Sequence, residues 1–260
     1  MARTKNKVNR IQRLDYIRSE LLNSGEVTIE KLSHKFCVSQ MTARRDLELL
    51  ESKGEVIRTH GGAALARRLI FEFAFRDKQS KNQQKKRSIA EKAAKYVKNG
   101  QVVILDTGTT TLQIARELIE KQKITIITTS LAIVSELQFA SGIEVILLGG
   151  FLRGGSPDMH GPLTEQNIEQ FSADIAFMGA DAVDGKGNTY TGDLRIVTLD
   201  RKMATNAKKV IVVADSQKFS NNAMCRVFKP DDYDLIISDS GVDKRIIRKM
   251  AKLGINIELV

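Results

Sequence analysis

The stretch Ser39-Gln40-Met41-Thr42-Ala43-Arg44-Arg45-Asp46-Leu47 decides the fold of the first part of this chain. Serine is a favoured first residue of helices because its side-chain oxygen accepts a hydrogen bond from a free amide of the first turn. A helix is therefore predicted to begin here and to run to about Lys53. A second short helical pattern covers residues 28–36, and only Cys37 and Val38 separate the two. Two short helices joined by a tight turn, the second basic at its start, fit the major groove of DNA.

The sequence on either side of this helix pair predicts a third helix and a small hairpin. Apolar residues at positions 11, 14, 17, 21 and 22 repeat near the helical period from about Arg10. Asn23-Ser24-Gly25 is expected to end that helix, because glycine adopts the left-handed conformation readily. Residues 55–64 alternate in character and contain two adjacent glycines, which is typical of a β-wing.

Candidates for contact with DNA lie on the second helix of the pair and on the wing. Residues at the start of a helix inserted in the groove reach base edges, so Gln40 and Thr42 are candidates for sequence readout. Arg44 and Arg45 would bind phosphates or a guanine edge. The wing residues would meet backbone phosphate or a minor groove. The predicted DNA-binding set is Ser39, Gln40, Thr42, Arg44, Arg45, Arg58 and His60. The alternative interpretation is a solvated helical surface without a partner.

The net charge of +10 is concentrated in the first 98 residues. Residues 1–66 carry twelve basic and eight acidic side chains, residues 67–98 carry eleven and three, and residues 99–260 carry eighteen and twenty. A basic block beside a nearly neutral body is typical of a protein that binds a polyanion, and nucleic acid is the first candidate.

Cysteine and histidine are scarce, which argues against a metal site and against a disulfide framework. The chain has two cysteines and three histidines, and none of them has the spacing of metal ligands. Cys37 is expected to be a small core residue in the turn between the two helices. The sequence shows neither a secretory signal nor an apolar run of membrane-spanning length. We therefore expect a cytoplasmic protein that needs no cofactor or metal.

Strand-like and helical stretches alternate in the second part of the chain. Strands are predicted at residues 102–106, 124–129, 144–150, 175–181, 209–215, 234–239 and 255–260, and helices at 83–98, 110–121, 131–139 and 163–171. Such alternation implies a mostly parallel sheet covered on both faces, which is the α/β class. The predicted domains are a winged helix-turn-helix at residues 1–63, a basic linker at 64–82, and a larger α/β domain at 83–260.

Polar residues follow five of the predicted strands, and ligands of such sheets bind beyond the carboxyl ends of the strands. Gly108 lets the backbone approach a ligand, and free amides at a helix start attract phosphate. Asp106 and Asp181 would accept hydrogen bonds from sugar hydroxyls, and Lys218 would pair with phosphate. The threonine-rich turn is weaker evidence by itself, since such residues also cap helices. The predicted effector-binding set is Asp106, Thr107, Gly108, Thr109, Thr110, Thr111, Thr128, Thr129, Ser130, Gly149, Gly150, Asp181 and Lys218.

Motifs in both parts of the chain resemble one family. The run from Val38-Ser39 through Thr42-Ala43-Arg44-Arg45-Asp46-Leu47 to His60-Gly61-Gly62-Ala63 resembles the winged helix-turn-helix of DeoR-type bacterial transcription regulators. Residues 105–111, 147–150, 177–181 and 214–219 are similar to the sensor domain of that family, which is related to ribose-5-phosphate isomerase. The resemblance implies a repressor of sugar or polyol metabolism genes that binds double-stranded operator DNA. It also implies control by a phosphorylated sugar or polyol and assembly as a homodimer or homotetramer.

Two departures from the family pattern matter for the predicted ligand site. Thr129 stands where the family usually has asparagine. Leu194-Arg195-Ile196-Val197 stands where the family often has a glutamate-alanine pair. Arg195 would favour a more anionic ligand; the alternative is that the site has decayed.

Two other functions are compatible with these residues. In the first, Asp106, Asp181 and Lys218 would move protons in a sugar-phosphate isomerase. A DNA-reading module gives such an enzyme no advantage, so we predict a protein that is not an enzyme. In the second, the chain is an architectural DNA binder, which would bind all duplexes equally, whereas a regulator prefers its operator by a large factor.

Overall fold

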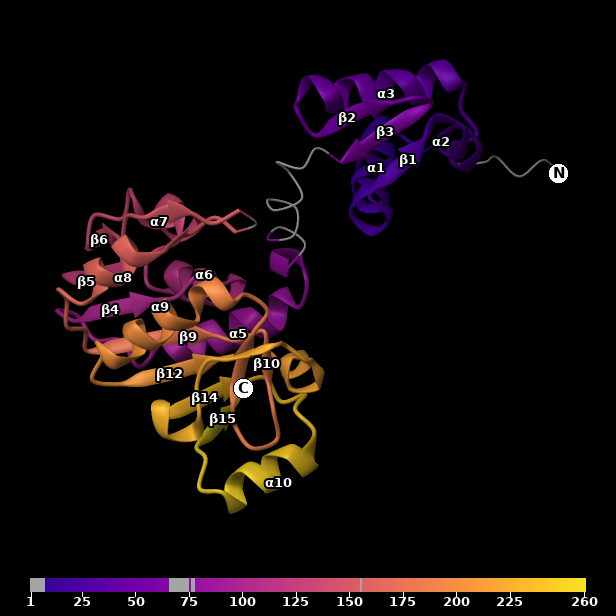
Figure 1. The fold of residues 1–260 in the computed structure, drawn as a ribbon. Helices are drawn as coiled ribbons and strands as arrows, with labels where there is room; N and C mark the ends of the chain where they lie inside the picture. The colour runs from indigo at the N-terminus through magenta and orange to yellow at the C-terminus, as the bar shows by residue number, and fades with distance from the viewer. Residues whose placement is uncertain (1–7, 66–74, 76–77, 155) are drawn as a thin grey trace. The chain divides into compact units, whose positions relative to one another are not determined.

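The chain forms two compact units, residues 1–77 and 78–260, each with its own hydrophobic core (Figure 1). The computed structural model describes residues 8–65, 75, 78–154 and 156–260. Most of the predicted linker at 64–82 lies outside these ranges, so the domain boundaries at 63 and 82 stay predictions. None of the helices in the described ranges is long and apolar enough to cross a membrane.

The first unit contains the predicted helix pair, the preceding helix and the wing. Its elements are α1 (Arg10–Ser24), β1 (Glu26–Thr28), α2 (Ile29–Phe36), α3 (Gln40–Ser52), β2 (Val56–Thr59) and β3 (Gly62–Leu65). Ser39 caps α3 as predicted, since its Oγ accepts a hydrogen bond from the amide of Thr42 at 3.1 Å. Thr28 caps α2 in the same way, and its Oγ1 accepts one from the amide of Lys31 at 3.2 Å. Gly25 ends α1 in the left-handed conformation with φ 78°.

The prediction that Cys37 is a core residue is wrong. Cys37 is the residue that ends α2, it has a φ of 51°, and its side chain is exposed. The tight turn between α2 and α3 requires one left-handed residue, and the backbone position that satisfies the turn directs this side chain to solvent. The sequence shows an apolar neighbourhood here, but the backbone geometry decides which way the thiol faces.

The wing belongs to a three-stranded antiparallel sheet in the order β1-β3-β2. The first strand was not predicted, because its three residues are too few to show an alternating pattern. Gly62 is required where β3 meets β1, since a Cβ at this position would lie 2.0 Å from the carbonyl oxygen of Val27. The core beneath the sheet and helices consists of Leu14, Ile17, Leu21, Val27, Ile29, Leu32, Ala43, Leu47, Leu50, Val56 and Ala63.

The second unit is built on a seven-stranded sheet in the order β15-β14-β12-β9-β4-β5-β6, and every neighbouring pair is parallel. The strands are β4 (Val102–Leu105), β5 (Ile124–Thr128), β6 (Ile143–Leu147), β9 (Ile175–Gly179), β12 (Val210–Val213), β14 (Leu235–Ser238) and β15 (Ile257–Leu259). All seven lie within or one residue outside the predicted strand ranges. The predicted α/β class is confirmed.

Helices connect these strands and cover the sheet (Figure 1). They are α5 (Gln83–Ala94), α6 (Thr109–Glu117), α7 (Leu131–Leu137), α8 (Pro162–Ile168), α9 (Leu194–Thr205) and α10 (Lys244–Lys252), with short 3-10 turns η1 (Ser216–Ser220) and η2 (Pro230–Asp232). The predicted helix at 83–98 ends four residues earlier than expected, and the other three predicted helices end two to four residues early.

Short antiparallel strands beside the main sheet were not predicted. One group is β10 (Ala182–Val183), β11 (Thr189–Thr191) and β13 (Cys225–Arg226), and the other is the hairpin of β7 (Phe151–Leu152) and β8 (Met159–His160). Strands of two or three residues carry no periodicity, so pairing between distant segments defines them rather than local sequence.

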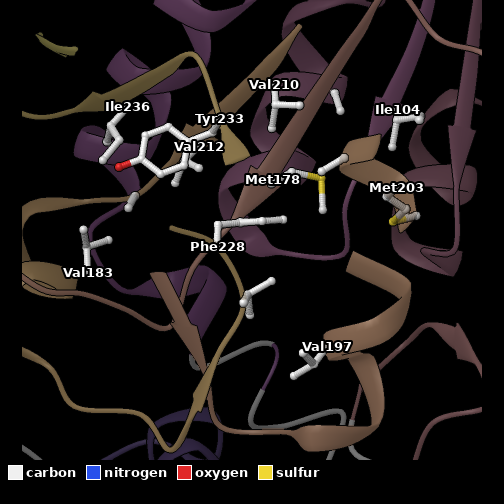
Figure 2. Close-up of a cluster of buried hydrophobic side chains, with 14 of the residues drawn as sticks. Ile104, Met178, Val183, Val197, Met203, Val210, Val212, Phe228, Tyr233 and Ile236 are labelled. Atoms are coloured by element: carbon white, nitrogen blue, oxygen red, sulfur yellow. The ribbon is translucent and has the colours of Figure 1, made fainter. Parts of the chain in front are cut away.

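The main core lies on one face of the sheet. Ile104, Met178, Val212 and Ile236 come from four neighbouring strands and belong to one buried cluster. Val212 is paired with Met178 and with Ile236, so these three side chains share one face of the sheet. Figure 2 shows Phe228 and Tyr233 beside these strand residues, together with Val197 and Met203 of α9. This packing fixes α9 against the sheet.

Candidate functional site

The start of α3 presents polar and basic side chains to solvent. Gln40, Arg44 and Arg45 are exposed, and Leu47 and Leu50 anchor the opposite side of the helix in the core. The buried residues Ala43, Leu47 and Leu50 are three or four positions apart and therefore share one side of the helix. Gln40, Thr42, Arg44 and Arg45 were all expected to point outward; three of them are exposed and Thr42 is half-buried, and their contact with DNA stays a prediction.

Ser39 and Thr42 have structural roles at the same helix start. Ser39 Oγ accepts the Thr42 amide, and the two hydroxyl oxygens lie 2.9 Å apart. Thr42 is half-buried. Both hydroxyls keep hydrogen-bonding capacity, but the cap already orients them, so Gln40 is the better placed of the two predicted base readers.

The wing places one of its two predicted residues against α3. Arg58 is half-buried, and its Nη1 donates to the carbonyl oxygen of Arg44 at 3.4 Å. Its Nε is buried and has no hydrogen-bond partner among the described residues. His60 is exposed in the turn between β2 and β3. Arg58 thus links the wing to the helix, while His60 is free to approach a ligand.

An ion-pair network that the sequence did not predict holds α1 against α3. The Asp46 carboxylate is 2 % exposed and accepts hydrogen bonds from Arg13 Nε at 2.7 Å and from Arg10 Nε at 3.2 Å. Arg13 Nη2 adds a third bond to the same carboxylate at 3.3 Å. Asp46 therefore fixes the orientation of the helix that carries Arg44 and Arg45.

Asp106 stands at the end of β4, where the second unit was predicted to bind a ligand. Its two carboxylate oxygens accept the backbone amides of Thr107 at 2.5 Å and of Gly179 at 2.9 Å. Burial raises the pKa of Asp106 to about 6, although these two amides and Arg153 oppose the change. The side chain is thus a buried acid at the junction of β4 and β9.

The threonine-rich turn after Asp106 leads into α6 through Gly108. Gly108 offers no side chain to the amides of the first helical turn, so no side-chain cap is present there. Thr111 Oγ1 donates to the carbonyl oxygen of Asp106 at 2.6 Å, which closes the turn. Amides at a helix start that lack a cap are suited to bind an anion.

The end of β5 lies next to this turn. Thr107 Oγ1 and Thr129 Oγ1 are 2.9 Å apart, so the structure brings these two predicted residues together. Thr128 Oγ1 accepts the amide of Ser130, and Ser130 Oγ accepts the amide of Ile133 at the start of α7. The hydroxyls of Thr128 and Ser130 therefore accept hydrogen bonds from nearby backbone amides. Thr129 is the residue whose hydroxyl faces Thr107 in the turn after β4.

The two predicted glycines after β6 shape the backbone. The Gly149 carbonyl accepts a hydrogen bond from Thr164 Oγ1 at 2.9 Å. A Cβ on Gly150 would lie 1.9 Å from the same hydroxyl oxygen, and the φ of Gly150 is 158°. Both residues are accounted for by the contact between this loop and α8.

Asp181 follows β9 and is surrounded by cationic and amide groups. Its carboxylate pairs with Lys78 Nζ at 3.1 Å and accepts the amide of Gly192, also at 3.1 Å. Burial would raise its pKa, but Lys78, the Gly192 amide and Lys218 together hold the pKa below its usual value. Asp181 and Lys218 were both predicted to bind the effector, and the structure brings them close enough for Lys218 to lower the pKa of Asp181.

The ends of β4, β5 and β9, which carry Asp106, Thr129 and Asp181, are named here the rim. Sequence reasoning missed Arg153, a charged residue near this rim. Arg153 is paired with Asp158 at 2.9 Å and with Asp193 at 3.1 Å. Arg195 also pairs with Asp193, at 2.7 Å. The hydrogen bond from Arg195 is the main reason that the pKa of Asp193 lies below its usual value. The charge that Arg195 was predicted to offer to an anionic ligand is therefore already balanced by the residue that caps its own helix. The GlyGly-x-x-Arg spacing after β6 is the one signal that could have pointed to Arg153.

The segment that begins the second unit is tied to the same strand ends. Lys78 pairs with Asp181 after β9, Asn82 Nδ2 donates to Asp215 after β12 at 3.2 Å, and Lys85 pairs with Asp239 after β14 at 3.1 Å. The buried Lys86 donates to the carbonyl oxygens of Lys78 and Lys81. Residues 78–86, named here the strap, therefore cross the ends of three strands.

No group of three or more histidine, cysteine, aspartate or glutamate side chains with the geometry of a metal site occurs in the described ranges of the chain. The rim is thus built from carboxylates, hydroxyls, lysines and backbone amides. This set of groups suits a hydroxylated anion bound through hydrogen bonds and ion pairs.

Comparison with known proteins finds a family match for each of the two units. Residues 13–68 match the DeoR-like helix-turn-helix domain, and residues 81–240 match the DeoR C terminal sensor domain. A protein of Escherichia coli O157:H7 that has been assigned as aga operon transcriptional repressor is 32 % identical over 96 % of this chain and 93 % of its own length. The glycerol-3-phosphate regulon repressor of Escherichia coli K12 is 30 % identical over 90 % of this chain and 93 % of its own.

Among solved structures, a D-ribose-5-phosphate isomerase in complex with phospho-erythronic acid aligns with 53 % of this chain and 54 % of its own, at 23 % identity and a TM-score of 0.40. The two family matches together cover both units, and the relatives match nearly the full length of the chain. The chain therefore belongs to the DeoR family of transcriptional regulators.

Proposed function

We propose that this protein represses genes of sugar or polyol metabolism and that a phosphorylated sugar bound in the second unit controls its affinity for operator DNA. The observation that carries the proposal is the rim at the ends of β4, β5 and β9. There an uncapped helix start, two aspartates and a lysine lie in a chain whose other unit is a helix-turn-helix. The name of the relative that represses a glycerol-3-phosphate regulon agrees with this ligand class.

Each end of such a ligand has suitable partners on the rim. The phosphate would accept hydrogen bonds from the amides at the start of α6 and pair with Lys218. Sugar hydroxyls would donate to Asp181 and bond with Thr107 and Thr129. A neutral ligand would gain much less from the helix start, so affinity should depend on the phosphate.

Ligand binding in the second unit would change DNA binding through the contacts of the strap. Lys78 begins the second unit, and the residues just before it lead to the DNA-binding unit in the sequence. A bound phosphate would compete with Asp181 for Lys78 and so loosen one of the three ties of the strap. A ligand shifts the DNA-binding equilibrium only through such a difference in contacts between two states.

We propose further that the protein is not an enzyme. A catalytic base needs a basic atom free to take a proton from the substrate. Both Asp106 oxygens accept backbone amides, and Asp181 is paired with Lys78. Incubation of the purified chain with ribose 5-phosphate should give no ribulose 5-phosphate above the uncatalysed rate. Turnover above that rate would favour the isomerase.

Homodimers or homotetramers are proposed as the DNA-binding form. Two copies of α3 would then enter major grooves about one helical turn apart on one face of the duplex. Sedimentation of the free protein and of its complex with DNA would give the number of chains directly.

The main test is a gel shift on the DNA upstream of the protein's own gene. Binding should exceed that to random duplex of equal length, and one phosphorylated sugar from a panel should change it while its unphosphorylated form does not. Equal binding to all duplexes would support an architectural role instead. Specific binding that no phosphorylated sugar changes would contradict the proposed effector class.

Replacement of Gln40 with alanine should relax base preference at one operator position. Gln40 is exposed at the start of α3, and a bidentate contact to a base is worth about 1–3 kcal/mol of discrimination. Selection from a randomised operator library would measure this. Ser52→Ala, at the other end of α3, should keep the wild-type preference. A Gln40→Ala protein with unchanged preference would remove Gln40 from the readout set.

Replacement of Lys78 with alanine should shift operator affinity in the absence of effector toward the effector-bound value and should weaken the response to effector. Effector coupling is typically about 1–3 kcal/mol, or 5-fold to 150-fold in affinity. Most of that factor should be lost, because the tie that the phosphate would break is already absent. Operator titrations with and without effector measure it, and Lys95→Ala, at the exposed end of α5, is the control. A wild-type response would exclude the strap as the route.

A further inference from the structure

α10 is a strongly basic helix that belongs neither to the proposed effector site nor to the helix-turn-helix. Its nine residues contain no acid and five basic side chains, all of them exposed, namely Lys244, Arg245, Arg248, Lys249 and Lys252. The helix lies beyond residue 240, where the match to the sensor-domain model ends. The family match therefore does not account for this charge.

Apolar residues hold α10 on the second unit. Met250 is buried, and Ile246 and Ile247 are partly buried against the main core. The helix lies beside β15, which is an edge strand of the seven-stranded sheet (Figure 1). Because these apolar residues anchor the helix, its exposed basic side chains are not needed to pack it.

Only one of the five basic side chains of α10 pairs with a carboxylate of the described residues. Arg245 Nη2 lies 2.7 Å from Asp243, the residue that caps the helix. The acid of the neighbouring strand β15, Glu258, is paired with Lys92 instead. Within the described ranges, the other four cations of α10 therefore have no counter-charge from the protein.

The positive charge of the second unit is concentrated on this helix. Outside α10, residues 99–260 carry thirteen basic and twenty acidic side chains. Lys244 and Arg248, Arg245 and Lys249, and Arg248 and Lys252 are like-charged pairs four residues apart, and such pairs destabilise a helix. A bound polyanion would remove this repulsion.

The five cations form a surface that suits the phosphates of a duplex. With 3.6 residues per turn, they lie within an arc of about 140° on one side of the helix, and the distance from Lys244 to Lys252 along the axis is about 12 Å. B-DNA carries one phosphate charge per about 1.7 Å of its axis, so a surface of this length faces several phosphates. Phosphate contacts carry no sequence information, so this surface would bind duplex DNA of any sequence.

We propose that α10 is a second DNA-binding surface, which contacts phosphates of the duplex beside the operator while α3 occupies the operator. DNA is the polyanion that the charge of α10 and the helix-turn-helix of the first unit both favour. Operator binding by the first unit holds the second unit at a high effective concentration near the flanking duplex, so a weak contact there adds affinity. This goes beyond the proposed function, because it requires operator binding but no effector.

The first test compares operator duplexes of two lengths. One ends at the boundary of the nuclease footprint that the full-length protein gives upstream of its own gene, and the other extends by roughly 20 base pairs, about two helical turns, on each side. The protein should bind the longer duplex at least about tenfold more tightly at about 0.1 M salt, and this advantage should disappear at about 0.5 M salt. Equal affinity for the two duplexes would overturn the inference and leave the proposed function intact. A protein that gives no footprint would count against the proposed function itself.

The second test removes the cations at both ends and in the middle of α10. Lys244→Gln, Arg248→Gln and Lys252→Gln together leave the apolar side of the helix intact, and glutamine has nearly the helix propensity of lysine. Thermal unfolding should therefore match that of the parent. The triple variant should bind the shorter duplex normally and lose the advantage of the longer one. Its slope of log affinity against log salt on the longer duplex should fall by about 2–3, since each lost phosphate contact lowers it by about 0.9.

The matched control removes the same charge from exposed sites outside α10. It combines Lys95→Gln, Lys98→Gln and Lys123→Gln, and these three side chains are exposed. The control should keep both the advantage of the longer duplex and the salt slope of the parent. The same loss in the two triple variants would show that only the net charge of the protein matters, and would overturn the inference.

The reactivity of lysines locates the contact without any substitution. The full-length protein is acetylated in complex with each duplex, and mass spectrometry gives the extent of reaction at each lysine. Lys244, Lys249 and Lys252 should be protected several-fold on the longer duplex relative to the shorter one, whereas Lys95 and Lys98 should react equally on both. Equal reactivity of the α10 lysines would contradict the assignment even if the longer duplex binds more tightly. Protection by phosphatidylglycerol vesicles but not by the longer duplex would assign α10 to a membrane surface and overturn the inference.

Discussion

Replacement of both Arg44 and Arg45 with alanine should reduce operator affinity by roughly 30-fold or more, since each such contact is worth about 1–3 kcal/mol. Both side chains are exposed on α3, whose opposite side is held in the core by Leu47 and Leu50. The loss should therefore be in contact with DNA rather than in folding. Fluorescence anisotropy with a labelled operator gives the affinity directly.

The salt dependence of the double variant separates phosphate contacts from base contacts. A lost phosphate contact lowers the slope of log affinity against log salt by about 1 and weakens binding to all sequences. A lost contact to guanine leaves the slope nearly unchanged and weakens specific binding alone. Lys53→Ala, at the exposed end of the same helix, should change the affinity little. A double variant that binds the operator as tightly as the parent would contradict the placement of α3 in the groove.

Replacement of Asp46 with alanine should destabilise the first unit by about 3–5 kcal/mol, which is the usual effect of removing one partner of a buried ion pair. The Asp46 carboxylate is nearly inaccessible and accepts three guanidinium hydrogen bonds from Arg10 and Arg13. Removal would leave Arg13, itself largely buried, without its acceptor. Amide hydrogen exchange in α1 and α3 should therefore be faster in this variant than in the parent. Hydrogen-exchange mass spectrometry on the full chain measures it.

The matched control for Asp46 is Asp15, whose carboxylate pairs with Arg18 on the surface of α1. An exposed pair of this kind contributes about 0–1 kcal/mol, so Asp15→Ala should leave exchange in both helices nearly unchanged. Exchange in the second unit should not change in either variant, since its core is separate. Equal exchange in the Asp46 and Asp15 variants would show that the network does not stabilise the helix pair.

The helix pair and the seven strands were predictable because their signals are local. Ser39 and Thr28 cap helices through bonds to amides three residues away, so the residues that make the bond are close in sequence. The strands of the large sheet are short apolar runs, because both faces of a parallel sheet are covered. The strand-end residues Asp106 and Thr107 could be proposed for the same reason, since parallel strands end on one edge of the sheet.

The direction of the Cys37 thiol and the pairing of β1 with β3 were not predictable. The first depends on a single left-handed backbone angle, and the second on a close approach that Gly62 permits between segments more than thirty residues apart. Several rim residues chosen from the sequence also have structural roles. Ser130 caps α7, and Gly150 makes room for Thr164, so their polar or flexible character does not by itself indicate ligand binding.

The sequence by itself determined the order and type of the main elements and the basic surface of α3, because hydrophobic period and helix capping act over a few residues. Only the tertiary structure decided which charges neutralise one another. Asp46 is balanced by Arg10 and Arg13, and Arg153 by Asp158 and Asp193. Ion pairs depend on the distance between side chains from separate elements and on their burial, and neither quantity is present in the order of residues along the chain.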